Sequence, residues 1–170
     1  MRRPLVFALV LALCATGAWA DMYSDCNQDK DDDRRIRGCT QIIERGEKEP
    51  QKNRAITYFN RGVAYAKKGE FDRAIADYDK AIVLNANDAK AYYNRGIAYG
   101  MKGEVDRVIA DYTKAIALDP DFAFAYYNRG VAYSIKGDKD QAIADFRKAL
   151  EINPSDQYAK ESLTELGVTP

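Results

Sequence analysis

The sequence contains no histidine, one tryptophan and three cysteines among its 170 residues. Without histidine, the chain lacks the most common general base of enzymes and the most common transition-metal ligand. Neither sign of charge dominates, since Lys and Arg together number 26 and Asp and Glu together also number 26. A chain with no net charge has no overall field that attracts nucleic acid. The composition therefore disfavours catalysis, a metal centre and nucleic-acid binding.

Three common kinds of functional centre cannot be assembled from these residues. The sequence offers no catalytic triad, no zinc-binding set and no phosphate-binding loop. Three Asn-Arg-Gly triplets are not phosphate loops, because each contains one glycine and lies inside a predicted helix. We therefore predict that the protein is not an enzyme and has no cofactor or metal. We expect no nucleic-acid partner, since the lysines are spread among acidic residues.

The first twenty residues differ from the rest of the chain. Arg2 and Arg3 give a positive start, residues 5–15 are almost continuously apolar, and Ala18-Trp19-Ala20 places small residues at both cleavage-site positions. These are the three parts of a secretory signal peptide. The apolar run is too short to cross about 30 Å of hydrocarbon comfortably, which disfavours a membrane anchor. We expect residues 1–20 to be cleaved and the mature protein to be periplasmic or secreted, with no stable membrane anchor.

The body of the chain repeats itself every 34 residues. Closely similar strings begin at Tyr58, Tyr92 and Tyr126, without a gap between them. Such self-similarity is the sequence signature of a repeat architecture. We divide this part of the chain into three repeats, at residues 55–88, 89–122 and 123–156.

Each repeat has the pattern of two helices joined by a short turn. In the first repeat, Gly62 and Tyr65 are spaced for one face of a helix, and Gly69 predicts its end. In the later repeats, Pro120 and Pro154 end the second helix, because proline cannot continue it.

This pattern resembles the tetratricopeptide repeat (TPR) family. That family has an aromatic residue at repeat position 4, Gly at 8, Tyr at 11, Ala at 20, an aromatic residue at 24, Ala at 27 and Pro at 32. The third repeat matches throughout, whereas the second departs only at Val108 and the first has Ala86 at the proline position. The resemblance implies an all-α, right-handed α-solenoid of about three and a half helix pairs.

Both ends of the array are expected to be special, since a terminal repeat has an unpaired face. Residues 21–54 form an N-terminal half-repeat and linker, whose first helix is truncated. Residues 157–170 look like the capping helix that ends many TPR arrays. The apolar residues of this helix are Tyr158, Ala159, Leu163 and Leu166.

The half-repeat contains both cysteines that remain after signal cleavage. By the repeat alignment, Cys26 stands at position 11, like Tyr65, and Cys39 stands at position 24, like Tyr78. In the TPR family these two positions face each other between paired helices. We predict a Cys26–Cys39 disulfide, because an exported chain enters an oxidising compartment. Two buried thiols are the alternative.

An acidic run precedes the next helix of the half-repeat. It consists of Asp29, Asp31, Asp32 and Asp33. A calcium loop would need a glycine at its turn, which is missing here. We therefore interpret the run as the cap and dipole partner of the helix that follows.

An arginine replaces the usual leucine at position 7, on the core side of each first helix. A charge in that place needs a partner. We predict that the three arginines pair with the aspartates at position 23; the alternative is that they bind an anionic ligand. The arginines are Arg61, Arg95 and Arg129, and the aspartates are Asp77, Asp111 and Asp145.

The face opposite the core of the first helices is predicted to line a peptide-binding groove. Aromatic residues stand there at position 5 and asparagines at position 6, and an amide can both donate to and accept from a peptide backbone. The asparagine run is similar to that of the TPR superhelix of O-linked N-acetylglucosamine transferase. The predicted groove residues are Phe59, Tyr93, Tyr127, Asn60, Asn94, Asn128 and Lys90.

The dicarboxylate clamp of chaperone-binding TPR proteins is matched only in part. Asn60 and Asn94 agree with it, but Ile56 and Phe124 stand at its lysine positions and Asn128 at its arginine position. We therefore do not expect a free C-terminal carboxylate to be the ligand.

Two hypotheses for function follow from the resemblance. The first is a protein-interaction scaffold, or adaptor, that binds a peptide or protein segment in its concave groove. The second is a structural or assembly protein that uses its ends and convex face. The partner, and whether the chain is an oligomer, cannot be read from the sequence.

Overall fold

The structure is a computed structural model that describes residues 20–28 and 30–170. This part of the chain consists of helices, turns and loops without a strand, so the predicted all-α helical-repeat fold is confirmed. None of the described helices combines the length and the hydrophobicity that crossing a membrane requires. The predicted signal peptide lies outside the described residues, apart from its last residue, Ala20.

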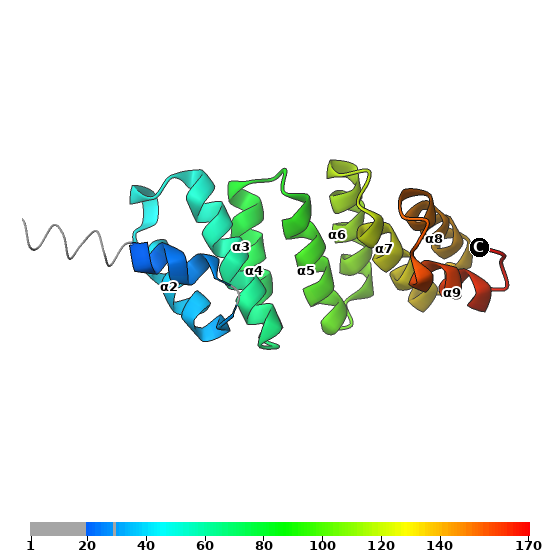
Figure 1. The fold of residues 1–170 in the computed structure, drawn as a ribbon, viewed down its shortest axis with the longest axis horizontal. Helices are drawn as coiled ribbons and strands as arrows, with labels where there is room; N and C mark the ends of the chain where they lie inside the picture. Colours follow the sequence, from blue (N-terminus) through cyan, green and yellow to red (C-terminus); the bar gives the residue numbers. More distant parts are fainter. Residues whose placement is uncertain (1–19, 29) are drawn as a thin grey trace, which may run out of the picture. The chain divides into compact units, whose positions relative to one another are not determined.

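The chain divides into two compact units, of which the first ends at Leu84. Residues 20–27 are helical and are followed by α2, α3 and α4, with a 3-10 turn between α2 and α3 (Figure 1). Helix α3 packs against both α2 and α4. The elements are α2 (Asp32–Glu44), η1 (Gly46–Lys48), α3 (Gln51–Lys67) and α4 (Phe71–Leu84).

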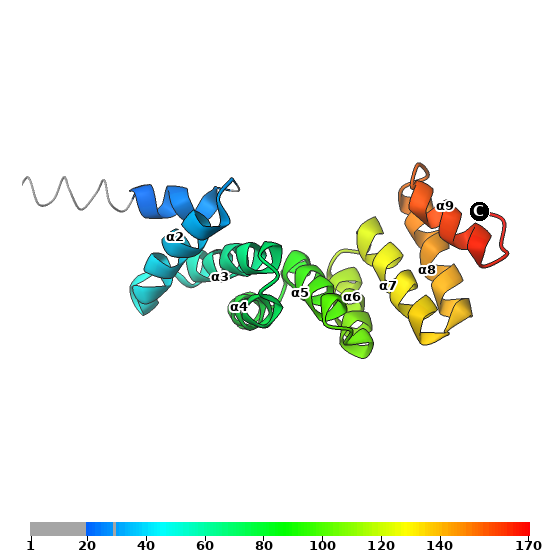
Figure 2. The same ribbon diagram turned by 90° about the horizontal axis from the view of Figure 1, so that it is seen from below.

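The second unit begins at Asn85 and contains the last two repeats and the C-terminal helix. Each helix of this unit packs against the next one, as Figure 2 shows for α5 to α8. The elements are α5 (Ala89–Met101), α6 (Val105–Leu118), α7 (Ala123–Lys136), α8 (Lys139–Ile152) and α9 (Gln157–Glu165).

Glycines end the first helices of the repeats, as predicted. Gly69, Gly103 and Gly137 have φ angles of 76°, 75° and 88°, in the left-handed region that glycine adopts without strain. After Gly69, the backbone N–H of Glu70 returns to the carbonyl of Tyr65 at 2.9 Å. This bond satisfies a carbonyl at the helix end and turns the chain into the second helix.

A glycine inside each first helix lets an aromatic ring of the second helix approach the backbone. A Cβ atom built on Gly62 would lie 2.8 Å from Cε1 of Tyr78. The same distance separates such an atom on Gly130 from Cε1 of Phe146. Positions 8 and 24 therefore fit together as backbone and ring, which explains why the sequence repeats both.

The first repeat differs from the expected boundaries at its start. Helix α3 begins at Gln51, directly after Pro50, and has 17 residues against 13 in α5. Proline favours the start of a helix because it lacks the N–H that would be unsatisfied there. The segment expected to be linker thus contributes one turn to the first repeat.

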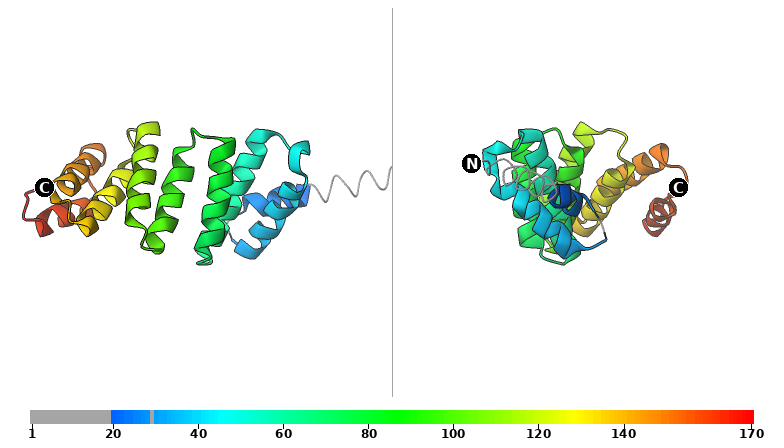
Figure 3. Two further views of the ribbon diagram at one scale, coloured as in Figure 1. Left: turned by 180° about the vertical axis from the view of Figure 1, so that it is seen from behind. Right: turned by 60° about the vertical axis from the view of Figure 1, so that its left-hand side comes forward.

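The two ends of the array have the caps that the sequence predicts, and one residue, Tyr158, differs from its expected burial. The Asp31 side chain accepts a hydrogen bond from the Arg34 backbone N–H at 2.9 Å and caps α2, as expected. At the other end, α9 packs against α8 through fully buried Ala159 and Leu163 (Figure 3). Tyr158, expected on this apolar side, is instead 71% exposed.

Candidate functional site

All three arginines of position 7 form two-pronged ion pairs with the aspartates of position 23. In each pair, Nε and Nη2 of the arginine donate to the two carboxylate oxygens at distances between 2.6 and 2.8 Å. The aspartate side chains are 7–8% exposed and the arginine side chains 16–18%. The pairs are Arg61–Asp77, Arg95–Asp111 and Arg129–Asp145.

Two tyrosines of the same helix hold each of these arginines in place, which the sequence pattern did not predict. The guanidinium carbon of Arg129 lies 5.7 Å from the ring centre of Tyr126 and 5.9 Å from that of Tyr133. The hydrogen bonds and charge of Asp145 raise the pKa of Arg129, against the effect of burial. The arginines are therefore part of the packing within the repeats, and the observed contacts favour this structural role over anion binding.

Some of these arginines also bridge neighbouring helix pairs. Arg129 Nη1 donates to Thr113 Oγ1 of α6 at 3.0 Å, and Arg61 Nη1 donates to Thr40 Oγ1 of α2 at the same distance. One guanidinium thus fixes the register of its own helix pair and contacts the preceding one.

The two cysteines of the half-repeat are joined by a disulfide in the structure. Cys26 and Cys39 lie 13 residues apart, with 4.6 Å between their Cα atoms. They are 1% and 0% exposed and pack with Met22 and Ile42. The bond links helical residues 20–27 to α2 within the cluster that includes Met22 and Ile42.

The aromatic residues at position 5 are half-buried. Each packs against the aromatic ring at position 24: the ring centres are 5.9 Å apart for Phe59 and Tyr78, and 5.6 Å for Tyr127 and Phe146. The ring of Tyr93 lies 4.7 Å from that of Phe122. These rings belong to the helix packing as much as to a groove surface.

The asparagines at position 6 make three different contacts. Asn60 Nδ2 donates to Asn27 Oδ1 at 3.0 Å, and Asn94 Nδ2 donates to the carbonyl of Lys90 at 2.8 Å. Asn128 Nδ2 donates to Tyr93 Oη at 2.9 Å and so links α7 to α5. Burial raises the pKa of the Tyr93 hydroxyl, which this bond partly offsets. Among the predicted groove residues, Asn94 and Lys90 thus contact each other within α5, and Asn128 and Tyr93 contact each other across two helices.

A hollow of about 450 Å³ lies in the second unit, where α5, α6 and α7 meet. Its rim carries two large, mostly exposed apolar side chains, Met101 (64%) and Ile135 (70%). The lining otherwise consists of small or apolar residues with two polar groups, the Asn128 amide and the Tyr112 hydroxyl. The remaining lining residues are Ile97, Gly100, Gly103, Val105, Val108, Val131 and Ala132.

The sequence identified only part of this surface. Of the predicted groove residues, Asn128 lines the hollow. Lys90 is exposed at the start of α5, and Phe124 is 62% exposed at the start of α7. Met101 and Ile135 stand at position 13, seven residues after the asparagines of position 6 and therefore on the same face of the helix. This spacing could have identified them from the sequence.

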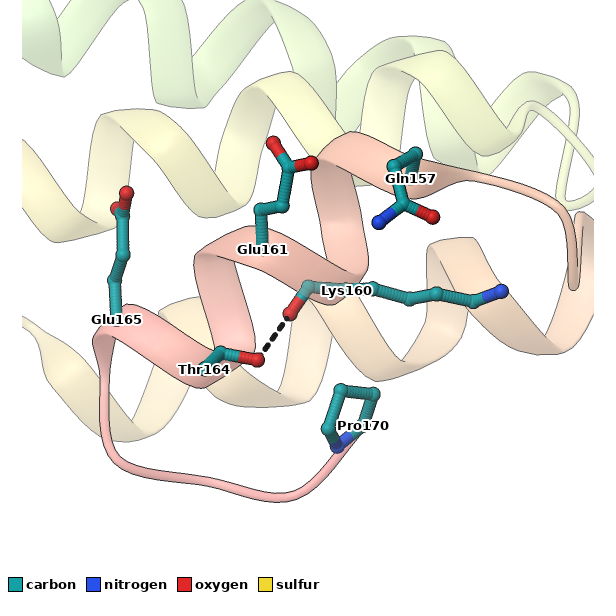
Figure 4. Close-up of a pocket in the computed structure, with 6 residues that line it drawn as sticks. All are labelled: Gln157, Lys160, Glu161, Thr164, Glu165 and Pro170. Atoms are coloured by element: carbon teal, nitrogen blue, oxygen red, sulfur yellow. Dashed lines mark hydrogen bonds between the residues drawn. The ribbon is translucent and has the colours of Figure 1, made fainter.

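Another hollow, of about 550 Å³, lies over the outer face of α9. Figure 4 shows its polar side chains pointing in different directions, with Glu161 and Glu165 directed away from Pro170. The hydroxyl of Thr164 bonds back to the carbonyl of Lys160 at 2.9 Å. Since these groups do not converge, they do not form a recognisable site. Within residues 20–28 and 30–170, no group of three or more Cys, Asp or Glu side chains is placed to hold a metal ion.

Comparison with protein families agrees with the repeat pattern. The model of the family described as Tetratricopeptide repeat matches residues 89–122 and 123–156. A second model, described as TPR repeat, matches residues 62–103. No curated protein matches the sequence closely enough to count as a relative.

Several solved structures are similar to this chain. The TPR domain of Arabidopsis OM64 is 30% identical, with a TM-score of 0.67, over 69% of this chain and 98% of that domain. A crystal structure of MamA is 29% identical, with a TM-score of 0.78, over 89% of this chain and 80% of MamA. The second TPR domain of human RPAP3, in complex with an HSP70 peptide, is 29% identical, with a TM-score of 0.66, over 69% of this chain and 98% of that domain.

The three lines of evidence agree. The sequence repeats every 34 residues, the described helices pack pairwise through the residues that define the repeat, and two family models cover residues 62–156 between them. The chain belongs to the tetratricopeptide repeat family.

Proposed function

We propose that this protein is a non-enzymatic interaction scaffold that binds a segment of another protein in the hollow between α5 and α7. The observation that carries the proposal is the exposure of Met101 and Ile135 on the rim of an apolar depression. Large apolar side chains grouped around a depression are typical of interaction sites. The complex of human RPAP3 with an HSP70 peptide supports a peptide or protein segment as the ligand.

The chemistry of the hollow favours an apolar segment. None of the described residues that line it carries a charge. Asn128 is the lining amide, and its carbonyl oxygen remains able to accept a hydrogen bond from a peptide N–H, while its N–H bonds to Tyr93. Because Phe124 and Asn128 stand where a carboxylate clamp would have cations, the segment needs no free C-terminus.

An assembly role through the C-terminal end has less support. The outer face of α9 carries polar side chains, among them Lys160, Glu161 and Glu165 (Figure 4). A face of this kind is what a capping helix presents to water. We also infer from residues 1–20 that the protein acts outside the cytoplasm, in the periplasm or after secretion.

A peptide selection tests the proposal. Peptides selected from a random library on the mature protein are expected to contain apolar anchors and to bind equally well with an amidated C-terminus. The double variant Met101→Glu, Ile135→Glu should weaken a selected synthetic peptide about tenfold or more, because it places charges beside buried apolar groups. The matched control is Val83→Glu, since Val83 is 79% exposed on α4 and lies outside the hollow.

Two results would contradict the proposal. One is that the double variant binds the selected peptides as tightly as the unchanged protein. The other is that amidation of the peptide C-terminus abolishes binding. Tyr127 is not a suitable position for this test, because its ring packs against Phe146 and Tyr158 and its removal would disturb the fold.

A further inference from the structure

A hollow of about 400 Å³ lies in the first unit, where α2, α3 and α4 meet. Three arginines from three different helices line it: Arg37 on α2, Arg61 on α3 and Arg73 on α4. One carboxylate, that of Glu44, stands among the lining residues. The other lining residues are Ile36, Thr40, Gln41 and Tyr65.

The ring of Tyr65 organises two of these arginines. The guanidinium carbon of Arg73 lies 4.2 Å from the ring centre and that of Arg61 lies 5.7 Å from it. Arg61 is further fixed by Asp77 and by Thr40. Stacking on an aromatic ring leaves the edge of a guanidinium, with its N–H donors, available to a ligand.

The lining residues themselves carry three arginines against one glutamate, and the carboxylates that pair with two of these arginines lie outside the lining. Asp77 neutralises Arg61, and Glu70 contacts Arg73 at 2.6 Å. The Arg73–Glu70 pair is exposed, at 61% and 34% for the two side chains, and such surface pairs are weak enough for a ligand to replace them. Arg37 is exposed, and Asp33, one turn before it, bonds to Lys68.

The other repeats show that the fold does not need this charge. By the repeat register, Ala110 stands where Arg37 stands in the half-repeat, and Gln141 stands where Arg73 stands in the first repeat. Both of these residues lie in regular helices, α6 and α8. Arg37 has no equivalent arginine in the later repeats and Arg73 has none in the third repeat, so neither is required for the packing of a helix pair.

We propose that this hollow is a second binding site, separate from the one between α5 and α7, and that it takes an acidic side chain of a partner protein. A carboxylate can accept paired N–H bonds from an arginine, and this geometry gives both strength and direction. Ile36 and the Tyr65 ring offer apolar contact to the methylene groups of a glutamate. Glu44 supplies the only carboxylate among these lining residues. It repels an acidic ligand and therefore weakens binding.

The test uses an acetylated and amidated hexaglutamate peptide, titrated into the full mature chain by calorimetry, with hexaglutamine as the uncharged control. The expected result is binding of hexaglutamate alone, which weakens as salt is added. The variant Arg37→Ala, Arg73→Gln introduces the residues that the third repeat carries at these positions, Ala144 and Gln141, and should weaken binding about tenfold. Glu44→Ala should tighten it.

Arg107→Gln is the matched control, because Arg107 occupies the position of Arg73 in the second repeat and has the same neighbours, a tyrosine ring at 5.2 Å and a glutamate at 2.8 Å. It should leave the affinity unchanged.

Equal losses in Arg107→Gln and in the double variant would overturn the proposal, as would no hexaglutamate binding at about 1 mM. So would binding of inorganic phosphate or anionic vesicles without peptide binding. If the double variant does not fold, the Glu44→Ala result decides.

Discussion

The carboxylate of Asp145 accepts two hydrogen bonds from one guanidinium, that of Arg129, at 2.7 and 2.8 Å across the α7–α8 pair. Because both side chains are largely withdrawn from water, the pair matters mainly when one partner is lost. Asp145→Ala should lower the free energy of unfolding by about 3 kcal/mol, since it leaves a guanidinium unpaired. Urea unfolding followed by circular dichroism measures the change, and Glu161→Ala, on the exposed face of α9, should stay within about 0.5 kcal/mol of the unchanged protein.

Gly130→Ala should destabilise the protein by about 1–3 kcal/mol, because the added methyl group would lie 2.8 Å from Phe146. Gly100 is the control, since a Cβ atom there meets only Val108, at 3.7 Å. Gly100→Ala should therefore cost nothing in stability, as alanine favours a helix more than glycine does. Thermal unfolding of the two variants compares them directly; equal destabilisation would mean that close ring packing does not explain the glycine at position 8.

Removal of the Cys26–Cys39 bond by the double change to alanine should cost about 2–4 kcal/mol in the first unit. The cost arises because the crosslink restricts the unfolded chain and joins residues 20–27 to α2. In this variant, amide hydrogen exchange should be faster in α2 than in the unchanged protein. The exchange rates in α7 and α8 should not change. Alkylation of two thiols in the unreduced, exported protein would instead show that the bond does not form in the cell.

Stability should fall at alkaline pH because two tyrosines are buried. Burial raises the pKa of the Tyr78 and Tyr112 hydroxyls, since desolvation penalises the charged form. A pKa that is higher in the folded state means that the stabilisation is complete below the unfolded value, about 10, and is lost as the pH rises above it. Phe146 stands at the same position in the third repeat, so Tyr112→Phe is compatible with the fold. This variant should lose less stability as the pH rises. Urea unfolding between about pH 8 and pH 11 measures the effect.

The control for this titration is Tyr158→Phe, since Tyr158 is exposed. An unchanged pH profile is expected for it. If Tyr112→Phe gave the profile of the unchanged protein as well, ionisation of this buried ring would not be the cause of the alkaline decline.

Much of the fold could be predicted because the same packing solution recurs every 34 residues. A charge on a core face needs a partner, so the arginines at position 7 could be matched with the aspartates at position 23. The structure then shows that the pairs form within a repeat, as between Arg95 and Asp111. The alignment likewise placed Cys26 opposite Cys39. These predictions depend on backbone geometry, which the repeat fixes.

Other features depend on rotamers and on exposure, which a one-dimensional pattern does not contain. The asparagines looked equivalent in sequence, yet Asn94 bonds to its own helix while Asn128 reaches Tyr93. Tyr158 precedes Ala159 by one residue, so it points about 100° away from the buried stripe and lies beside Tyr127 instead. The hollow in the first unit was missed because its three arginines come from separate helices.

The interface between the two helices of a pair is packed in two different ways along this chain. In the half-repeat a covalent bond fills it, whereas aromatic rings such as Tyr78 and Phe146 fill it in the later repeats. The strength of ring packing varies with temperature and denaturant, and a sulfur–sulfur bond is indifferent to both. The array therefore has a built-in polarity: under denaturing conditions the α9 end should unfold first, while the disulfide keeps helical residues 20–27 attached to α2.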